Sequence, residues 1–183
     1  MRTMLIGAVM LLACPIITLI AGGWCASVSC ADDKGDKTSE QAKAICEKFN
    51  KALFAKDVDA AMKLVATPWF DNYVEKGEGA IRKDAAEVKK HLEEQVKTIG
   101  KEDMKGEVGL KIIDNLTYEK MLTKVGDKLK PEEKKMLDAV LKKTDRVLNV
   151  HVTVDGTARS HFFMFVGWRD GEAKVVGYKE LEP

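Results

Sequence analysis

The chain has 183 residues, with 30 lysines and arginines against 29 aspartates and glutamates, and 45% of its residues are hydrophobic. These values describe one compact domain, and a formal net charge of +1 excludes a general nucleic-acid-binding surface. With only 4 prolines and 14 glycines, the chain is neither collagen-like nor of low complexity.

The N-terminal segment has the layout of an export signal. No residue between Arg2 and Asp32 is charged, and residues 4–21 are almost wholly apolar. Small residues stand at the minus-three and minus-one positions of a cleavage after Ala31, and a polar segment follows. We therefore expect residues 1–31 to be a signal peptide and the mature chain to be exported, either secreted or periplasmic.

Two alternatives for this segment remain open. The apolar run approaches the roughly 20 residues that span a bilayer, so an uncleaved membrane anchor is one of them. A lipidated Cys30 is the other. Pro15 and Gly22-Gly23 weaken a spanning helix, and the position three before Cys30 is Ser27 rather than leucine. Membrane contact is expected only through such a retained or lipidated N-terminus.

Cysteine usage points to a core without disulfides. Cleavage after Ala31 removes three of the four cysteines and leaves Cys46, so no intramolecular disulfide can form. Cys46 falls on an apolar helical stripe between Ile45 and Phe49, which predicts a small buried hydrophobic side chain rather than a reactive thiol.

The first half of the mature chain is predicted to be helical around one aromatic segment. After a polar tail over 32–37, a single domain is expected over 38–183. Its first helix begins at Thr38, where Gln41 completes a capping box. A second helix is capped by Asp57 and stopped by Thr67-Pro68, and a third begins at Asp84, with Glu87 as capping partner, and ends at Gly100. Between the second and third lies an extended segment with Trp69, Phe70, Tyr73 and Val74, which ends at a turn with Gly77 and Gly79.

The second half is predicted to be mostly strand. Alternation over 108–112 predicts one strand, and helical spacing over 117–143 predicts an inserted helical hairpin. The last forty residues predict a three-stranded antiparallel meander over 146–154, 157–169 and 172–180, joined by Asp-Gly turns. The fold class is therefore α+β, with N-terminal helices packed on a bent antiparallel sheet.

The turn geometry predicts a register for this meander. With two-residue loops, His161 lies opposite Val150 and Glu180, so His151 and His161 face opposite sides of the sheet and cannot share a metal. No metal site and no cofactor are expected. One face then carries Leu148, Val150, Phe163, Phe165, Val176 and Tyr178. The other face carries Phe162, Met164, Val166 and Trp168, and because it is too apolar for water we expect either the hairpin or a homodimer partner to cover it.

The order of elements resembles the nuclear transport factor 2-like superfamily, which includes SnoaL-like and ketosteroid-isomerase-like proteins. The likeness rests on the two helices joined through 55–61, on Pro68-Trp69-Phe70, on the third helix and on the closing strand 170–178. The resemblance implies a cone, in which a strongly bent sheet wraps a long helix and leaves a pocket. Family enzymes use a pocket aspartate as base with tyrosine or aspartate oxyanion donors. No residue here is matched to those roles, and the hairpin at 117–143 departs from the family pattern.

The candidate catalytic group is His161 with Glu180 and Tyr178. A carboxylate beside an imidazole raises its pKa and fixes its tautomer, which suits a general base. The alternative interpretation is a solvated polar rim, and His91 is expected at the boundary of its helix. The residues expected to line a ligand site are Trp69, Tyr73, Phe163, Phe165, Tyr178, Arg159 and His161.

Two functions are compatible with these patterns. The first is a non-catalytic exported module that binds a small apolar or amphipathic molecule, or a protein partner, through the pocket or a sheet face. The second is an enzyme of the isomerase, dehydratase or hydrolase kind that uses His161, Glu180 and Tyr178. A buried titratable group inside an apolar site would favour the second.

Overall fold

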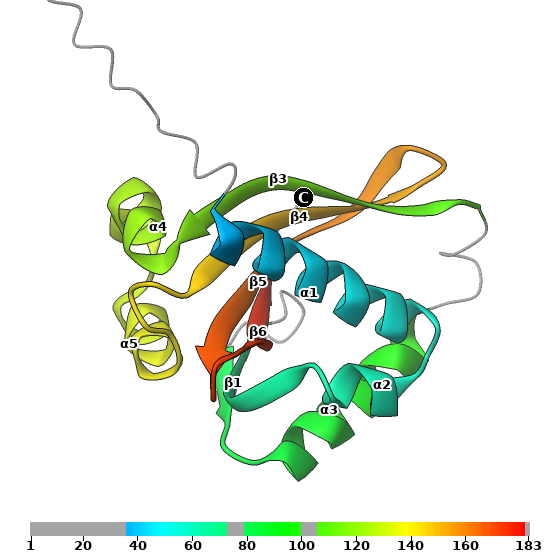
Figure 1. Cartoon of the computed structure of the whole chain (residues 1–183), viewed down its shortest axis with the longest axis horizontal. Coiled ribbons are helices and arrows are strands. Elements are labelled where there is room, and N and C mark those ends of the chain that lie inside the picture. The colour runs from blue at the N-terminus through cyan, green and yellow to red at the C-terminus, as the bar shows by residue number, and fades with distance from the viewer. Residues whose placement is uncertain (1–35, 73–78, 100–105, 182–183) are drawn as a thin grey trace, which may run out of the picture. The chain divides into compact units, whose positions relative to one another are not determined.

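A computed structural model describes residues 36–72, 79–99 and 106–181, which belong to one compact unit, Asp32–Pro183. The predicted signal peptide, Tyr73, Val74, Gly77 and Gly100 lie outside the described residues. The elements follow one another along the chain as α1 (Lys37–Phe54), α2 (Val58–Met62), β1 (Val65–Asn72), β2 (Gly79–Arg82), α3 (Ala85–Thr98), β3 (Val108–Thr117), α4 (Tyr118–Val125), a 3₁₀ turn (Gly126–Lys128), α5 (Pro131–Val140), β4 (Arg146–Val154), β5 (Thr157–Arg169) and β6 (Glu172–Glu180) (Figure 1).

Aspartate side chains cap the three N-terminal helices. Asp57 accepts a hydrogen bond from the backbone of Ala60, and Asp84 accepts one from the backbone of Glu87, as predicted. At α1 the cap is Asp36, whose carboxylate accepts from the Thr38 backbone, so the helix begins one residue before the expected start.

Six strands form one sheet in the order β2-β1-β6-β5-β4-β3. All neighbours are antiparallel except β1 and β6, which run parallel, so the sheet is mixed rather than antiparallel. The second helix also ends earlier than predicted, because the Leu64 carbonyl already accepts a hydrogen bond from the Val175 backbone at the start of β1. Pro68 is tolerated because the β1/β6 register is irregular between Val65 and Phe70. Strand β2 was not predicted, because Gly79 was expected to lie in a turn.

The meander of β4, β5 and β6 has the predicted bounds. Asp155 and Asp170, each followed by glycine, have positive φ angles of 50° and 53°, as two-residue hairpin turns require. The predicted register was wrong, however. One irregularity between Val152 and Thr153 and another between Phe165 and Val166 shift the pairing by one residue.

This shift exchanges the two faces of β5. Leu148 lies opposite Met164 rather than Phe163, and Phe162, not His161, lies opposite Glu180. Because side chains alternate along a strand, a slip of one residue moves every side chain of that strand to the other face.

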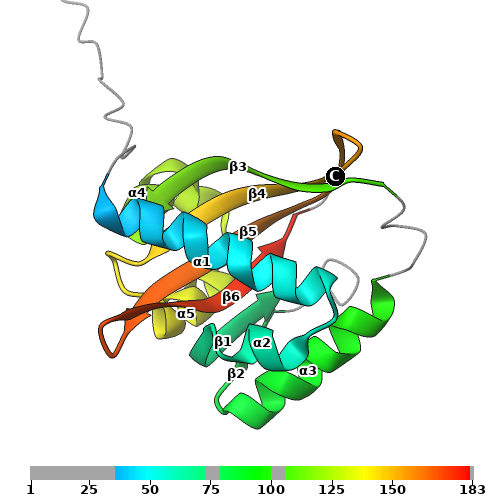
Figure 2. The ribbon, with the colours of Figure 1, turned by 45° about the vertical axis from the view of Figure 1, so that its right-hand side comes forward.

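One face of the sheet is covered by α1, which lies across β4, β5 and β6 (Figure 2). Met164 and Val166 are fully buried there, and Phe162 and Trp168 are half-buried against the same cluster. The face predicted to be open to a dimer partner is therefore a core face. A homodimer stays a prediction, and it would need another surface of the chain.

The other face is covered by the helical hairpin. The sequence predicted the hairpin itself, but the face that the hairpin or a dimer partner was expected to cover is the one that lies under α1. Tyr118 and Met121 of α4 and Leu137 and Val140 of α5 pack with the side chains that β1, β4, β5 and β6 present there, namely Phe70, Val147, Phe165 and Val176. Among the described residues, Ile113 is the large hydrophobic side chain that remains exposed. Around these residues, both faces of the sheet are thus buried within one chain.

The corrected register predicts which side chains of β5 carry stability. Met164→Ala should lower the free energy of unfolding by about 2–5 kcal/mol, because it leaves a cavity under α1. Urea denaturation checks this, with exposed Thr157→Ala in the same strand as control, expected within about 0.5 kcal/mol of the unmutated protein. Equal stability of the two variants would contradict the register.

Candidate functional site

Four polar side chains from four elements meet at the α3 side of the sheet. The parallel pairing of β1 and β6 sets Asp71 beside Tyr178. The antiparallel pairing of β1 and β2 sets Arg82 opposite Trp69, two residues from Asp71 on the same face. Helix α3 brings His91 onto them. We call Asp71, Arg82, His91 and Tyr178 the polar cluster.

His91 is the centre of the cluster. Its Nε2 lies 2.9 Å from Oδ2 of Asp71 and 3.0 Å from the hydroxyl oxygen of Tyr178. Nη2 of Arg82 lies 3.0 Å from His91 Nδ1 and 2.8 Å from Asp71 Oδ2. Because a guanidinium only donates, Nδ1 of His91 accepts, and the imidazole is the neutral tautomer with its hydrogen on Nε2. The Nε2–H group then donates to Asp71 and Tyr178.

The cluster is enclosed by protein. His91 and Tyr178 are each 4% exposed, and so is Asp71, whereas the Arg82 side chain is 27% exposed. Burial raises the pKa of the Asp71 carboxyl, but the hydrogen bonds from His91 and Arg82 and the charge of Arg82 outweigh it and hold that pKa below its ordinary value. Asp71 is therefore ionised at neutral pH, and Arg82 balances its charge.

Three polar atoms on this face have no hydrogen-bond partner within the described part of the chain: Oδ1 of Asp71, Nε of Arg82 and Nε1 of Trp69. Buried polar groups are nearly always satisfied in folded proteins. The described residues thus leave one carboxylate acceptor and two N–H donors of this face without a partner.

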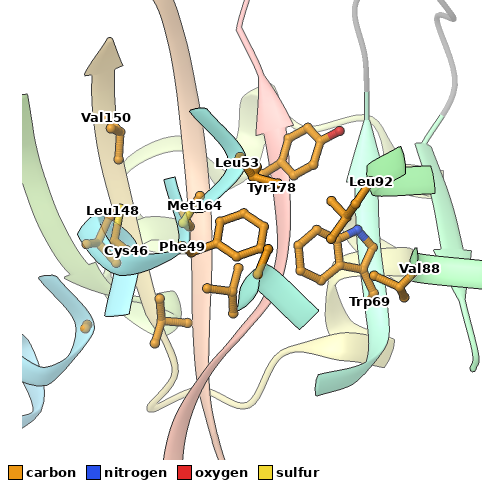
Figure 3. Packing of buried hydrophobic residues seen from close by; sticks show 14 of the residues in the cluster. Cys46, Phe49, Leu53, Trp69, Val88, Leu92, Leu148, Val150, Met164 and Tyr178 are labelled. Atoms are coloured by element: carbon orange, nitrogen blue, oxygen red, sulfur yellow. The ribbon is translucent and has the colours of Figure 1, made fainter. Parts of the chain in front are cut away.

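Apolar side chains surround the cluster. The centroid of the Trp69 ring lies 5.8 Å from the ring centroid of Phe49 and 5.9 Å from that of Tyr178. Figure 3 shows Trp69 beside Val88 and Leu92 of α3. The space expected to be a cavity, between α1 and the sheet, is occupied by buried side chains such as Phe49, and the polar cluster lies at its α3 end.

The predicted catalytic group is not assembled. Tyr178 belongs to the polar cluster, but the shifted register puts His161 on the opposite face from Tyr178 and Glu180. There His161 forms a hydrogen bond with the Asn149 side chain. Its ring centroid lies 4.2 Å from that of His151, its cross-strand neighbour. Burial and then the His151 charge lower the pKa of His161. The expectation that these two histidines face opposite sides was therefore wrong.

The predicted lining residues are divided between several places. Trp69 and Tyr178 lie at the cluster, while Phe163 and Phe165 pack on the other face of the sheet, with the helical hairpin. Arg159 is exposed in β5. Tyr73 lies outside the described residues. The ligand-binding role of this set stays untested, and two of its members share one site.

Sequence reasoning missed Asp71, Arg82 and His91. The alternation in β1 held a signal, because Trp69 and Asp71 share a strand face and an aspartate on a buried face needs a partner. His91 follows Val88 by three positions and so belongs to the buried stripe of α3 rather than to its boundary. Arg82 could not be placed, since β2 was not predicted.

Other ligand chemistry is limited in the described ranges. Over 36–72, 79–99 and 106–181, no group of three or more histidine, cysteine, aspartate or glutamate side chains could hold a metal ion. Cys46 is buried, as predicted, and burial raises the pKa of its thiol to about 12. No helix of the described ranges is both long enough and apolar enough to cross a membrane.

Comparison with known proteins finds likeness at the level of fold. No family model matches the chain, and no curated protein matches it. An NTF2-like protein of unknown function from Shewanella baltica OS155 aligns at 10% identity and a TM-score of 0.46, over 79% of this chain and 93% of that one. A ketosteroid isomerase-like protein from Erwinia carotovora atroseptica SCRI1043 aligns at 9% identity and a TM-score of 0.46, over 81% of this chain and 99% of that one. An NTF2-like protein of unknown function from Cytophaga hutchinsonii ATCC 33406 aligns at 11% identity and a TM-score of 0.37, over 76% of this chain and 88% of that one.

Solved structures described as NTF2-like and ketosteroid isomerase-like are thus among those that align with this chain, and they bear the names of the superfamily that the sequence resembles. The chain itself has helices packed on one six-stranded mixed sheet. The likeness concerns the fold and assigns no role to any residue.

The polar cluster predicts a pH-dependent contribution to stability. Asp71→Asn should lower the free energy of unfolding at pH 7 by about 1–3 kcal/mol, because the buried charge-assisted hydrogen bonds are weakened. The pKa of Asp71 is lower in the folded than in the unfolded chain, so its stabilisation is complete above the unfolded value. The stabilisation is lost as the pH falls below the ordinary value of 3.8 and through the folded pKa.

Urea denaturation at pH 7 and at pH 3 measures this difference. The gap between the unmutated protein and Asp71→Asn should shrink at the lower pH. Asp59→Asn is the matched control, because Asp59 pairs with Lys89 on the surface and such pairs contribute at most about 1 kcal/mol. A gap for Asp71→Asn that is independent of pH would show that its charge plays no part.

Proposed function

We propose that the chain is an exported binding protein for a small amphipathic molecule whose polar end binds at the polar cluster. The observation that carries the proposal is the buried, ionised Asp71, whose Oδ1 lacks a partner among the described residues. Leaving such an acceptor unsatisfied costs about 1–3 kcal/mol, and a donor on a ligand removes that cost.

The surroundings support a ligand that is apolar away from this end. Trp69, Val88 and Leu92 border the cluster and are fully buried. Sites for small molecules combine a mostly apolar lining with a few convergent polar groups. Arg82, the partly exposed member of the cluster, stands on the edge strand β2 and is the group that a ligand arriving from solvent meets first.

Acid–base catalysis is the second candidate function, and one observation favours it. Tyr178, His91 and Asp71 form a continuous hydrogen-bonded series in an enclosed site. In such a series the Tyr178 hydroxyl donates to a developing negative charge, and His91, held by Asp71, fixes its position. The reaction class is the one expected from the sequence, that of an isomerase, dehydratase or hydrolase. The candidate residues differ: Tyr178 belongs to both groups, but its partners are His91 and Asp71 rather than His161 and Glu180.

The binding proposal predicts unequal effects of two histidine substitutions. With 2-naphthol as probe, His91→Ala should weaken binding about fivefold or more, because it releases both Asp71 and Tyr178. His161→Ala, on the other face of the sheet, should leave binding unchanged. Chemical-shift titration of the Trp69 indole N–H resonance, assigned from the spectrum of Trp69→Phe, measures both.

Each outcome of this titration bears on the proposal. If 2-naphthol leaves the Trp69 resonance unmoved up to its solubility, the polar cluster is not a ligand site. If His161→Ala weakens binding as much as His91→Ala does, the site lies elsewhere. Conversion of a supplied ester or ketone at a rate lowered by Tyr178→Phe would instead establish the catalytic candidate.

A further inference from the structure

We infer that the ligand group at the polar cluster is neutral and carries an acceptor next to a donor, as a carboxamide or lactam does. This inference rests on the proposed function and specifies the chemical class of the ligand. It follows from the charges that the cluster already holds and from the three polar atoms that it leaves without partners.

The charge of the cluster is balanced before any ligand arrives. Asp71 contributes one negative charge, and Arg82 contributes one positive charge 2.8 Å away. His91 is neutral, because its Nδ1 accepts from Arg82. A carboxylate or ammonium group placed here would add an uncompensated charge to a site that is more than nine-tenths buried at Asp71, His91 and Tyr178.

The unpartnered atoms require both donors and acceptors on the ligand. Within the described residues, Oδ1 of Asp71 lacks a donor, whereas Nε of Arg82 and Nε1 of Trp69 lack acceptors. Trp69 lies directly opposite Arg82 and two residues from Asp71 on one strand face, so the three side chains project side by side. A carboxamide supplies an N–H donor and a carbonyl acceptor within one planar group, and it carries no charge.

Three ligands of nearly the same shape test this inference. Benzamide is neutral with a donor and an acceptor, benzoate is an anion with acceptors alone, and benzamidine is a cation with donors alone. For the full-length chain, titration of the Trp69 indole resonance should give at least tenfold tighter binding of benzamide than of either ion. Benzoate or benzamidine binding as tightly as benzamide would overturn the inference.

Charge-changing variants of the cluster should redirect this preference. Asp71→Asn leaves the positive charge of Arg82 unbalanced, so the affinity for benzoate should rise at least tenfold relative to that for benzamide. Arg82→Gln leaves the negative charge of Asp71 unbalanced, so the affinity for benzamidine should rise relative to that for benzamide instead. The matched controls are Asp59→Asn and Lys89→Gln, which change the net charge by the same amounts at an exposed ion pair and should leave the ranking unchanged. Amide-proton dispersion reports whether each variant is folded.

The outcomes separate this inference from the proposed function. If none of the three ligands shifts the Trp69 resonance in the unmutated protein, the proposed binding function fails and the ligand class fails with it. If all three bind at Trp69 with similar affinity, the binding function stands and the neutral class is wrong. A preference that the cluster variants and the surface controls alter equally reflects net charge and also overturns the inference. The ranking of the three ligands in the unmutated protein decides the inference even if a cluster variant does not fold.

Discussion

The two irregularities in the pairing of β5 determine which of its side chains enter each of the two cores of this structure. They lie between Val152 and Thr153 on one side and between Phe165 and Val166 on the other. Each shifts the pairing by one residue, and together they put Met164 and Val166 under α1 and Phe165 under the helical hairpin. Since both faces of the sheet are apolar, either assignment would bury hydrophobic side chains, and hydrophobic alternation alone cannot choose between them.

This ambiguity explains what the sequence could and could not predict. The strand bounds of the meander and the caps at Asp57 and Asp84 depend on local chemistry, and the structure confirms them. The register depends on bulges that no local pattern marks, so the grouping of His161 with Glu180 and Tyr178 was wrong. The parallel pairing of β1 with β6 is equally non-local, because it joins segments about a hundred residues apart.

The polar cluster follows from the same non-local pairing. Asp71 reaches Tyr178 because β1 lies parallel beside β6, and Arg82 reaches Asp71 through the short edge strand β2. The cluster thus joins the chain's early strands to its last one, at a place where apolar packing by Trp69 and Leu92 excludes water. A low local dielectric strengthens the hydrogen bonds of His91 and makes every unsatisfied atom there costly.

Stability and function make different demands on such a cluster. A purely structural network is most stable when every member is satisfied, because one unpaired buried group weakens it. Here the hydrogen bonds to His91 have ordinary lengths of 2.9 and 3.0 Å, whereas Asp71 Oδ1, Arg82 Nε and Trp69 Nε1 stay without partners among the described residues. A network that orients its members and yet leaves both an acceptor and donors without partners is what the proposed binding role requires, because preorganised groups gain their full stabilisation once a ligand is bound. The unused atoms, rather than the satisfied ones, are therefore the feature that distinguishes a binding role from a structural one.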